Sequence, residues 1–550
     1  MKGSGRNMSY GIAEIPEPKN EPILSYAPGT PEREQLKKIL NELQSKEIEI
    51  PIIIGGKKYK TGDIGECRAP HDHKLLLGRY HKVTTDLVEK AIDVALKARE
   101  GWCRLPWEQR SAVFLRMAEL LAGPHRMTLN AATMLCQGKN VFQAEIDSAC
   151  ELIDFYRFNP YYMQQLYKMQ PMSVGDSWNR VEYRPLEGFV FAVTPFNFTS
   201  IAGNLPTSPA LMGNVVLWKP ARSVIYTSHF LLELFRDAGV PDGVITMLPG
   251  SGKVISPPIL GHPDFAGIHF TGSTSTFQYL WKTIGENLEK YKTYPRMVGE
   301  TGGKDFIFAH PSADTDALVT AMLRGAFEYQ GQKCSAASRA YIPKSKWSII
   351  KRKMLKDIKT MKMGSPTDFS NFINAVIDKG AYESIKKCII HAKRSKDAEI
   401  LIGGGFSDKI GYFIEPTVIL AKKPKFKTME EEIFGPVLTV FVYPDKEFEK
   451  YLKICDETSP YGLTGSIFAE DRNAISLAER TLRDAAGNFY INDKPTGAVV
   501  GQQPFGGGRA SGTNDKAGSL LNLIRWVSAR TIKENLNPPK DYRYPFLKKD

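Results

Sequence analysis

Short apolar runs alternate with helical segments through the centre of the chain. The apolar runs cover residues 188–193, 215–218, 244–248, 267–270 and 305–309, and each is closed by Gly, Pro or Ser. Apolar residues at helical spacing lie between them, over 223–238 and 274–288. Strands that alternate with helices predict a parallel sheet with helical crossovers. In such sheets, ligands bind at the carboxyl ends of the strands.

The residues before this region predict helices and an arm. Apolar positions recur at helical spacing from 87 to 126, which predicts two amphipathic helices joined near Leu105-Pro106, and another helix is expected over 141–165. The first part, to about Glu66, is polar and Pro-rich with one helical stretch over 31–45. We expect this part to pack over a later domain.

Length and cysteine usage exclude several classes of protein. A chain of 550 residues with 42% hydrophobic residues predicts two or three structural units. The 7 cysteines are scattered, without a C-x-x-C pair or a His cluster, so neither a disulfide scaffold nor a metal site is expected. Dispersed thiols favour a reducing compartment, either the mitochondrial matrix or the cytoplasm. No apolar run reaches the ~18 residues that a membrane span needs.

The amino terminus and the net charge favour no special partner. Met1–Asn7 carries two basic residues but lacks the features of a secretory signal, and a mitochondrial leader removed ahead of it is compatible with the sequence. The formal net charge of +13 favours anionic ligands in general. Because no basic run is interleaved with aromatic residues, no nucleic-acid partner is expected.

A thiol and a carboxylate are the strongest candidates for chemistry. Cys334 stands in the run Glu-Tyr-Gln-Gly-Gln-Lys-Cys-Ser-Ala (328–336), where small and polar neighbours keep a thiol reachable and the adjacent Lys333 favours the thiolate. Glu300 lies a short way upstream, in Gly-Glu-Thr-Gly-Gly-Lys (299–304). A nucleophile and a base indicate covalent catalysis on a carbonyl. Most free cysteines are simply small buried apolar residues, so the neighbourhood carries this interpretation.

Three features together indicate a dinucleotide, although the G-x-G-x-x-G fingerprint is absent. Gly272 and Ser273 end a predicted strand where a helix begins, so that free amides can face a pyrophosphate. Lys219 follows another strand, within reach of a ribose, and Glu432 in Glu-Ile-Phe-Gly-Pro (432–436) can hydrogen-bond a second ribose. An ordinary N-cap, a surface lysine and an exposed turn acid would each look the same in isolation.

The motifs resemble those of the aldehyde dehydrogenase superfamily. The matching segments are Pro-Phe-Asn-Phe (195–198), Trp-Lys-Pro (218–220), Thr-Gly-Ser (271–273), Glu-Thr-Gly-Gly-Lys (300–304), Gly-Gln-Lys-Cys (331–334) and Glu-Ile-Phe-Gly-Pro (432–436). The run 328–336 and the loop Gly-Ala-Val-Val-Gly-Gln-Gln-Pro-Phe-Gly-Gly (497–507) are similar to the branch that oxidises L-glutamate γ-semialdehyde. The resemblance implies an α/β fold with a Rossmann-like parallel-sheet cofactor domain, an α/β catalytic domain and a small β oligomerisation flap.

The resemblance also implies roles for individual residues. Cys334 is the nucleophile, Asn197 the oxyanion donor and Glu300 the base that activates water, with a pKa raised by burial. NAD is the implied cofactor, held by Thr194, Lys219, Gly272, Ser273, Thr274, Ser275, Thr276, Glu432 and Phe434. The substrate carboxylate is held by the backbone N–H groups of Gly497 and Ala498 with Ser335 assisting, while Phe198 and Phe505 pack on the aliphatic part.

Some positions depart from the superfamily pattern. Thr301 stands where relatives usually have Leu, and Phe277 stands where they often have Gly. These differences affect the expected pose of the cofactor and leave the catalytic assignments intact. Some relatives carry Ser in place of Ala498, so one hydrogen bond to the substrate is missing here.

Domain boundaries follow from the same pattern. We expect a cofactor-binding domain with the arm over 1–170 and 186–297, a catalytic domain over 298–530, and an oligomerisation hairpin and tail over 171–185 and 531–550. The hairpin is predicted around Val181–Tyr183, after the turn 173–179. A hairpin and an extended tail predict a homodimer or a larger homo-oligomer.

Other functions remain open at this point. Another semialdehyde, such as α-aminoadipic semialdehyde, or a simple aliphatic aldehyde would suit the same fold. An acyl-phosphate or acyl-CoA reductase would share Cys334 but would not need Glu300 as a hydrolytic base. A catalytically idle nucleic-acid-binding protein would not need Cys334, Glu300 and Asn197 together.

Overall fold

A five-stranded parallel sheet forms the centre of the first half of the chain. The computed structural model describes residues 11–547. Its first sheet has the order β11 (Arg296–Glu300), β10 (Phe265–Thr271), β7 (Phe189–Val193), β8 (Val215–Lys219) and β9 (Ile245–Met247). The crossover helices are α7 (Thr199–Leu211), α8 (Ile225–Ala238), α9 (Gly252–Leu260) and α10 (Thr274–Glu286). All neighbouring strands of this sheet are parallel and are joined by these helices, which confirms the predicted parallel sheet with helical crossovers.

Both faces of this sheet are buried under helices. Along β7, Phe189 and Phe191 pack into one apolar cluster, together with residues of α2 (Thr85–Trp102), whereas Val190 and Ala192 pack into another cluster on the opposite face. This alternation follows from the two-residue period of a strand. Strands buried on both faces favour apolar runs, and β7 consists of one, whereas β9 and β10 each contain a buried polar residue, Thr246 and His269.

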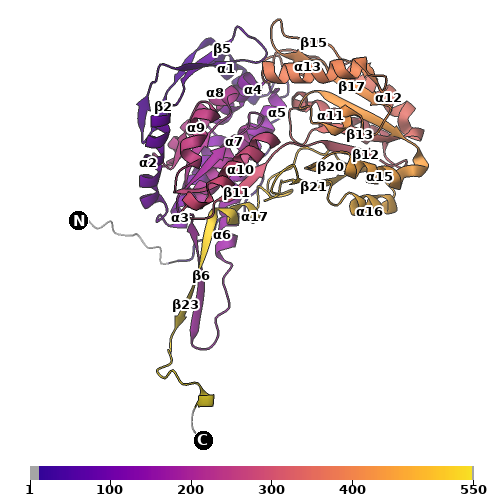
Figure 1. The fold of residues 1–550 in the computed structure, drawn as a ribbon. Coiled ribbons are helices and arrows are strands. Elements are labelled where there is room, and N and C mark those ends of the chain that lie inside the picture. Colours follow the sequence, from indigo (N-terminus) through magenta and orange to yellow (C-terminus); the bar gives the residue numbers. More distant parts are fainter. Residues whose placement is uncertain (1–10, 548–550) are drawn as a thin grey trace.

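A seven-stranded sheet forms the second half. Its order is β14 (Ala398–Ile402), β17 (Thr417–Ala421), β18 (Val437–Tyr443), β13 (Ala337–Pro343), β12 (Asp305–Ala309), β20 (Thr464–Phe468) and β21 (Asn488–Ile491). Only β14 runs antiparallel to its neighbour. Its helices are α11 (Thr315–Phe327), α12 (Lys344–Ile358), α13 (Lys379–Arg394), α15 (Phe448–Glu457) and α16 (Arg472–Thr481). The two halves lie side by side, indigo to magenta and orange in Figure 1.

The amino-terminal region has the predicted helices, together with strands within residues 48–81 and a helix, α4 (Arg126–Gln137), that were not predicted. Helix α1 spans Pro31–Ser45, and α2 and α3 (Trp107–Ala122) meet at the predicted junction. After α4, the predicted helix over 141–165 consists of α5 (Val141–Ala144), a π-helical segment Glu145–Glu151 and α6 (Leu152–Tyr167). Wider π-helical turns often occur at functional sites. A three-stranded sheet of β1 (Ile48–Ile50), β5 (Leu76–His81) and β4 (Ile64–Arg68), and a hairpin of β2 (Ile52–Ile54) and β3 (Lys57–Tyr59), complete this region.

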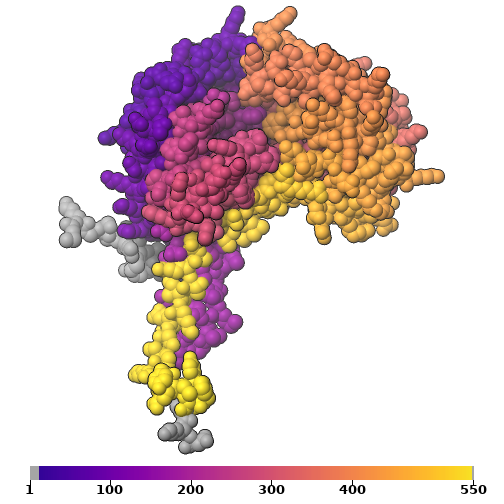
Figure 2. Space-filling model, viewed as in Figure 1, coloured from indigo at the N-terminus to yellow at the C-terminus, as the bar shows by residue number. Residues whose placement is uncertain are grey.

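The predicted hairpin has a different partner. The strand around Val181–Tyr183 exists as β6 (Ser177–Pro185), but it pairs antiparallel with β23 (Val527–Asn535) over its whole length. Among residues 11–176, which the structure describes, no strand pairs with β6, so the prediction of a hairpin within 171–185 was wrong. The two strands form a ribbon that projects from the body of the molecule, with the yellow β23 beside β6 (Figures 1 and 2).

Neither a membrane-spanning helix nor a cluster of metal ligands occurs among residues 11–547. None of their helices is long and apolar enough to cross a membrane. No group of three or more His, Cys, Asp or Glu side chains among them is arranged to hold a metal ion. The segment Met1–Asn7 lies outside the described residues.

Candidate active site

The predicted ligand-binding residues gather at the carboxyl edge of the first sheet. Thr194 follows β7, Lys219 ends β8, and the register pairs Val193 with Lys219. On the other side, Thr271 of β10 pairs with Glu300 of β11. The parallel topology therefore brings these segments to one edge, as expected for a sheet of this kind.

Cys334 lies just before β13, at the end of a loop with unusual backbone geometry. Tyr329 and Gln330 have φ of 51° and 53°, and Gly331 follows with φ of 65°. A Cβ at Gly331 would lie 2.2 Å from the carbonyl oxygen of Gly435, so only glycine fits there. Non-glycine residues in this region are uncommon and cluster at functional sites. The loop delivers Cys334 into a cavity of about 440 Å³.

The thiol of Cys334 is not activated in the way that the sequence predicted. Lys333 is buried and pairs with Glu328, Nζ to Oε2 at 3.1 Å, so its charge is neutralised there. Burial raises the pKa of Cys334 far above its usual value, and the nearby Asp305 and Glu300 raise it further. The expectation that Lys333 favours the thiolate was therefore wrong, and the thiol must lose its proton to a base during attack.

Glu300 lines the same cavity as Cys334. Its Oε2 accepts a hydrogen bond from the backbone N–H of Gly507 at 3.0 Å. Burial raises the pKa of Glu300 well above its usual value, against the opposing effects of the Gly507 N–H and Lys516. The direction agrees with the expectation for a general base that works near neutral pH.

Asn197 is buried beside the nucleophile loop. Its Nδ2 donates to the carbonyl oxygen of Gln332 at 3.1 Å, two residues before Cys334. The following helix, α7, begins with its first N–H groups bonded to a buried carboxylate: Asp147 accepts from the N–H of Thr199 at 2.9 Å and of Ser200 at 2.8 Å. Asn197 is thus held at the start of a fixed helix, where a preorganised amide donor is most effective.

The amino terminus of α10 fits a pyrophosphate. Ser273 caps the helix through the N–H of Thr276 at 3.3 Å, and Ser273, Ser275 and Thr276 are exposed. Thr274 is half-buried and donates to Thr301 at 3.2 Å. A helix amino terminus with exposed hydroxyls suits an anion. A Cβ at Gly272 would lie 2.8 Å from the Phe270 ring, so this turn needs glycine.

Other predicted cofactor residues are more enclosed. The hydroxyl of Thr194 is buried and accepts from Trp218 Nε1 at 2.9 Å. Lys219 is half-buried, donates to the Pro220 carbonyl at 3.2 Å, and has a pKa lowered to about 8, mainly by burial. Its chain passes over α9, 3.6 Å from the Cβ position of Gly252.

Glu432 and Phe434 lie across from this edge. Glu432 accepts from the backbone N–H of Gly303 at 2.8 Å, and burial raises its pKa. Phe434 has φ of 57° and its ring meets that of Phe196 edge to face, at 5.7 Å between centroids. Because Gly303 is close to Glu300 in the chain, this contact joins the two halves next to the predicted base.

The loop 497–502 forms another wall of the cavity. Gly497, Ala498, Ser335, Phe198 and Phe505 all line it, together with Cys334 and Glu300. Gly497 has φ of 96°, a conformation that needs glycine. Within residues 11–547, the N–H groups of Gly497 and Ala498 donate to no protein acceptor. Ser335 shares a hydrogen bond with Thr496 at 2.8 Å, which fixes it beside the loop.

Comparison with known proteins decides the family. The sequence profile of the aldehyde dehydrogenase family matches residues 59–531. The chain belongs to the aldehyde dehydrogenase family. Among its relatives, the mitochondrial Δ1-pyrroline-5-carboxylate dehydrogenase of Dictyostelium discoideum is 53% identical, covering 98% of this chain and 97% of the relative. The human mitochondrial enzyme of that name is 46% identical, covering 96% and 94%.

Solved structures of this family agree. The Δ1-pyrroline-5-carboxylate dehydrogenase of Mycobacterium tuberculosis bound with NAD has a TM-score of 0.95 and 49% identity, covering 98% of this chain and 100% of that one. The α/β fold predicted for an aldehyde dehydrogenase is therefore confirmed. The departures from the common pattern also have a physical account. Phe277 stacks on Phe270, at 5.2 Å between centroids, and fills the space that a Cβ at Gly299 would occupy, 2.2 Å from its ring.

This aldehyde dehydrogenase has two cavity carboxyls that the sequence interpretation missed. Glu151 and Asp154 line the cavity with Cys334. Burial raises the pKa of Glu151 to about 8, and Ser200 donates to its Oε2 at 3.0 Å. With Asp147, these acids stand four and three residues apart, on one face of the helical stretch 141–167. That spacing was the available signal, because acids on a buried helix face need partners or a ligand.

Proposed function

We propose that this protein oxidises L-glutamate γ-semialdehyde, formed from Δ1-pyrroline-5-carboxylate, to L-glutamate with NAD, in proline catabolism. One observation carries the proposal: a single cavity contains the thiol of Cys334, the carboxyl of Glu300 and the free N–H groups of Gly497 and Ala498. A thiol and a base suit an aldehyde group, and the free N–H groups suit a carboxylate at the other end of the same molecule.

The residues at the cofactor edge fit NAD. Exposed hydroxyls and free amides at the start of α10 suit its pyrophosphate, Lys219 lies at the next strand end, and Glu432 lies across the edge. We propose that the cofactor is held by the nine residues predicted from the sequence: Thr194, Lys219, Gly272, Ser273, Thr274, Ser275, Thr276, Glu432 and Phe434. Bound NAD supplies an acceptor for the hydride that the substrate must lose.

The chain's own residues perform the remaining steps. The Cys334 thiol passes its proton to water as its sulfur attacks the aldehyde carbon, and the Asn197 amide and the backbone N–H of Cys334 donate to the oxygen that becomes negative. After the carbon has lost its hydride, it is bonded to Cys334 as a thioester. Glu300 takes a proton from water, which attacks the thioester and releases L-glutamate and the free thiol.

Substrate recognition uses both ends of the cavity. We propose that Gly497, Ala498 and Ser335 hold the α-carboxylate, while Phe198 and Phe505 contact the methylene groups. A carboxyl oxygen of Glu151, which lines the cavity, offers a hydrogen-bond acceptor for the α-ammonium group of the substrate. A simple aliphatic aldehyde would leave both the free N–H groups and this carboxyl without partners, which favours the semialdehyde.

Assembly and location are proposals as well. The projecting ribbon of β6 and β23 supports a homodimer, in which the flap reaches a second copy. We propose a mitochondrial matrix location, because relatives from Dictyostelium discoideum and mouse are named as mitochondrial. The division into a cofactor domain (1–170 and 186–297), a catalytic domain (298–530) and a flap (171–185 and 531–550) also stays a proposal.

One assay tests the function. NADH formation is measured from racemic Δ1-pyrroline-5-carboxylate, from α-aminoadipic semialdehyde and from hexanal, each with NAD and with NADP. We expect the highest kcat/KM for Δ1-pyrroline-5-carboxylate with NAD, and no turnover by Cys334→Ala, because carbon cannot form the thioester. Equal or better turnover of hexanal would contradict the proposed substrate.

A further inference from the structure

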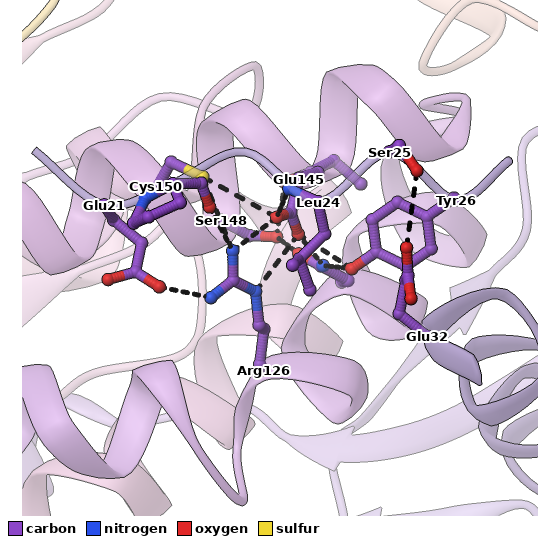
Figure 3. A network of polar contacts seen from close by, with 12 residues as sticks. Glu21, Leu24, Ser25, Tyr26, Glu32, Arg126, Glu145, Ser148 and Cys150 are labelled. Carbon is purple, nitrogen blue, oxygen red and sulfur yellow. Dashed lines mark hydrogen bonds and ion pairs between the residues drawn. The ribbon is translucent and has the colours of Figure 1, made fainter. Parts of the chain in front are cut away.

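The amino-terminal arm, residues 11–30, is anchored deep in the first half by a buried polar network (Figure 3). Tyr26 donates to Glu145 Oε2 at 2.8 Å, and the N–H of Leu24 donates to Glu145 Oε1 at 2.9 Å. Arg126 pairs with Glu145 and, at 2.5 Å, with Glu21 Oε1. Arg126 and Glu145 are both buried, so the arm has one fixed path at this point.

One arm residue bridges two walls of the active-site cavity. Asn20 Nδ2 donates to Asp154 Oδ2 of α6 at 2.8 Å and to the carbonyl oxygen of Val500 at 2.7 Å. Its Oδ1 accepts from Gln502 Nε2 at 2.9 Å. The neighbouring N–H of Glu21 donates to Asp154 Oδ1 at 2.7 Å. Asn20 thus joins the loop 497–502 to helix α6.

The arm is also part of the cavity wall. Asn20, Glu21 and Ile23 line the same cavity as Cys334. The loop that Asn20 holds at Val500 presents the free N–H groups of Gly497 and Ala498 only three and two residues away. The family profile begins at residue 59, so this arm lies outside the part of the chain that the whole family shares. An element outside the shared catalytic fold is well placed to serve selectivity.

We propose that Asn20 is a positioning residue for substrate selection, which fixes the loop 497–502 so that its N–H groups meet the substrate α-carboxylate. This inference rests on the proposed function. Without Asn20, the loop loses two hydrogen bonds and its connection to α6, while Cys334, Glu300 and Asn197 keep their own supports. Recognition of the carboxylate then weakens, whereas the chemistry at the aldehyde carbon does not depend on the arm.

The test compares Asn20→Ala with the full-length wild-type protein on two substrates. The ratio of kcat/KM for Δ1-pyrroline-5-carboxylate to that for hexanal is expected to fall about tenfold, since one or two hydrogen bonds to a loop are lost. The loss is expected in KM rather than in kcat. Binding of L-glutamate, measured by calorimetry, is expected to weaken by the same factor. The matched control is Ser25→Ala, an exposed arm residue that bonds only within the arm and to Glu32, which should change neither value.

A second variant separates positioning from folding. Gln502→Ala removes only the hydrogen bond from Gln502 Nε2 to Asn20 Oδ1. Because Gln502 is exposed, this substitution should leave the melting temperature unchanged. In a double-mutant cycle, Asn20→Ala and Gln502→Ala should be non-additive in the selectivity ratio, because they act through one contact.

The outcomes separate this inference from the proposed function. An unchanged ratio for Asn20→Ala, or equal losses on both substrates, would overturn the role of Asn20 while the wild-type activity stands. If the wild-type protein itself fails to oxidise Δ1-pyrroline-5-carboxylate, the proposed function is the part that fails.

Discussion

Lys139 and Asp147 form an ion pair that is buried between Phe198, which precedes α7, and Tyr329, which lies in the loop before Cys334. Lys139 Nζ lies 2.5 Å from Asp147 Oδ2, and the two side chains are 1% and 0% exposed. The same ammonium group lies 4.3 Å from the ring centroid of Phe198 and 4.5 Å from that of Tyr329. Asp147 holds the start of α7 after Asn197, and Tyr329 begins the loop of Cys334. The pair therefore connects the segment of Asn197, the proposed oxyanion donor, to the loop of Cys334, the proposed nucleophile.

Removing the charge of Lys139 should destabilise the protein. Lys139→Met leaves Asp147 buried without its cation, a change that costs about 3–5 kcal/mol in the free energy of unfolding. Urea unfolding followed by fluorescence measures it. Lys450→Met, which removes an exposed pair with Glu447, is the control and should stay within about 0.5 kcal/mol. Equal losses in the free energy of unfolding for the two substitutions would show that the buried pair stabilises the protein no more than the exposed pair does.

Glu300→Gln should separate the two halves of the reaction. The variant keeps the shape of the side chain but cannot take a proton from water, so acylation proceeds and hydrolysis stalls. Stopped-flow absorbance should show a burst of about one NADH per active site, followed by a steady rate lowered by about 10²–10⁴. An acyl adduct on Cys334, detected by mass spectrometry, is the second readout. Full steady turnover would remove Glu300 from this role.

Lys516 opposes the effect of burial on the pKa of Glu300, so we expect it to influence the pH dependence of the proposed base. Burial raises the pKa of Glu300, Lys516 lowers it, and Asp515 raises it, while the thiol of Cys334 also faces the carboxyl. Glu300 acts as a base only when ionised, so hydrolysis of the thioester falls as pH drops through this raised pKa. Lys516→Met removes the opposing cation, and the acidic limb should move to higher pH.

The deacylation rate, measured against pH in stopped flow, checks this prediction. Lys516→Arg, which keeps the charge, should hold the limb near its wild-type position. Because Lys516 also donates to the carbonyl oxygens of Gly487 and Gly506, melting temperatures must accompany the rates. If the acidic limb of the pH profile does not move in Lys516→Met, the charge of Lys516 has no effect on the pKa of Glu300.

Local patterns in the sequence predicted most of the fold because they reflect local physics. The runs that became β7 and β8 are apolar throughout, as expected of strands buried on both faces, whereas the run of β10 contains His269, which is buried and hydrogen-bonded to the Leu205 carbonyl. The pairing of β6 with β23 could not be predicted, because it joins residues about 350 positions apart and both strands are partly polar. Strand partners depend on the whole topology, and a single short strand does not specify them.

The site shows the same division. The predicted residues gather at one edge because parallel strands end together, and the motifs mark those ends. Lys333 was misjudged because its neighbour in sequence is Cys334, whereas its partner in space is Glu328. Asn20 gave no signal at all, since a polar residue in a Pro-rich segment resembles any loop until its contact with Val500 is seen.

Ala498→Asp should abolish use of the semialdehyde and spare the cofactor. The new carboxylate would stand beside the free N–H groups of the loop and repel the substrate α-carboxylate at close range, a cost of several kcal/mol. We expect kcat/KM for Δ1-pyrroline-5-carboxylate to fall by at least about a hundredfold, since each 1.4 kcal/mol is tenfold. Ala498→Ser, of similar size but uncharged, is the control and should retain or improve KM. The affinity for NAD, measured by fluorescence, should not change in either variant, because the cofactor-binding residues proposed here lie at the sheet edge. A parallel loss of NAD binding in Ala498→Asp would mean that the loop 497–502 serves the cofactor as well as the substrate.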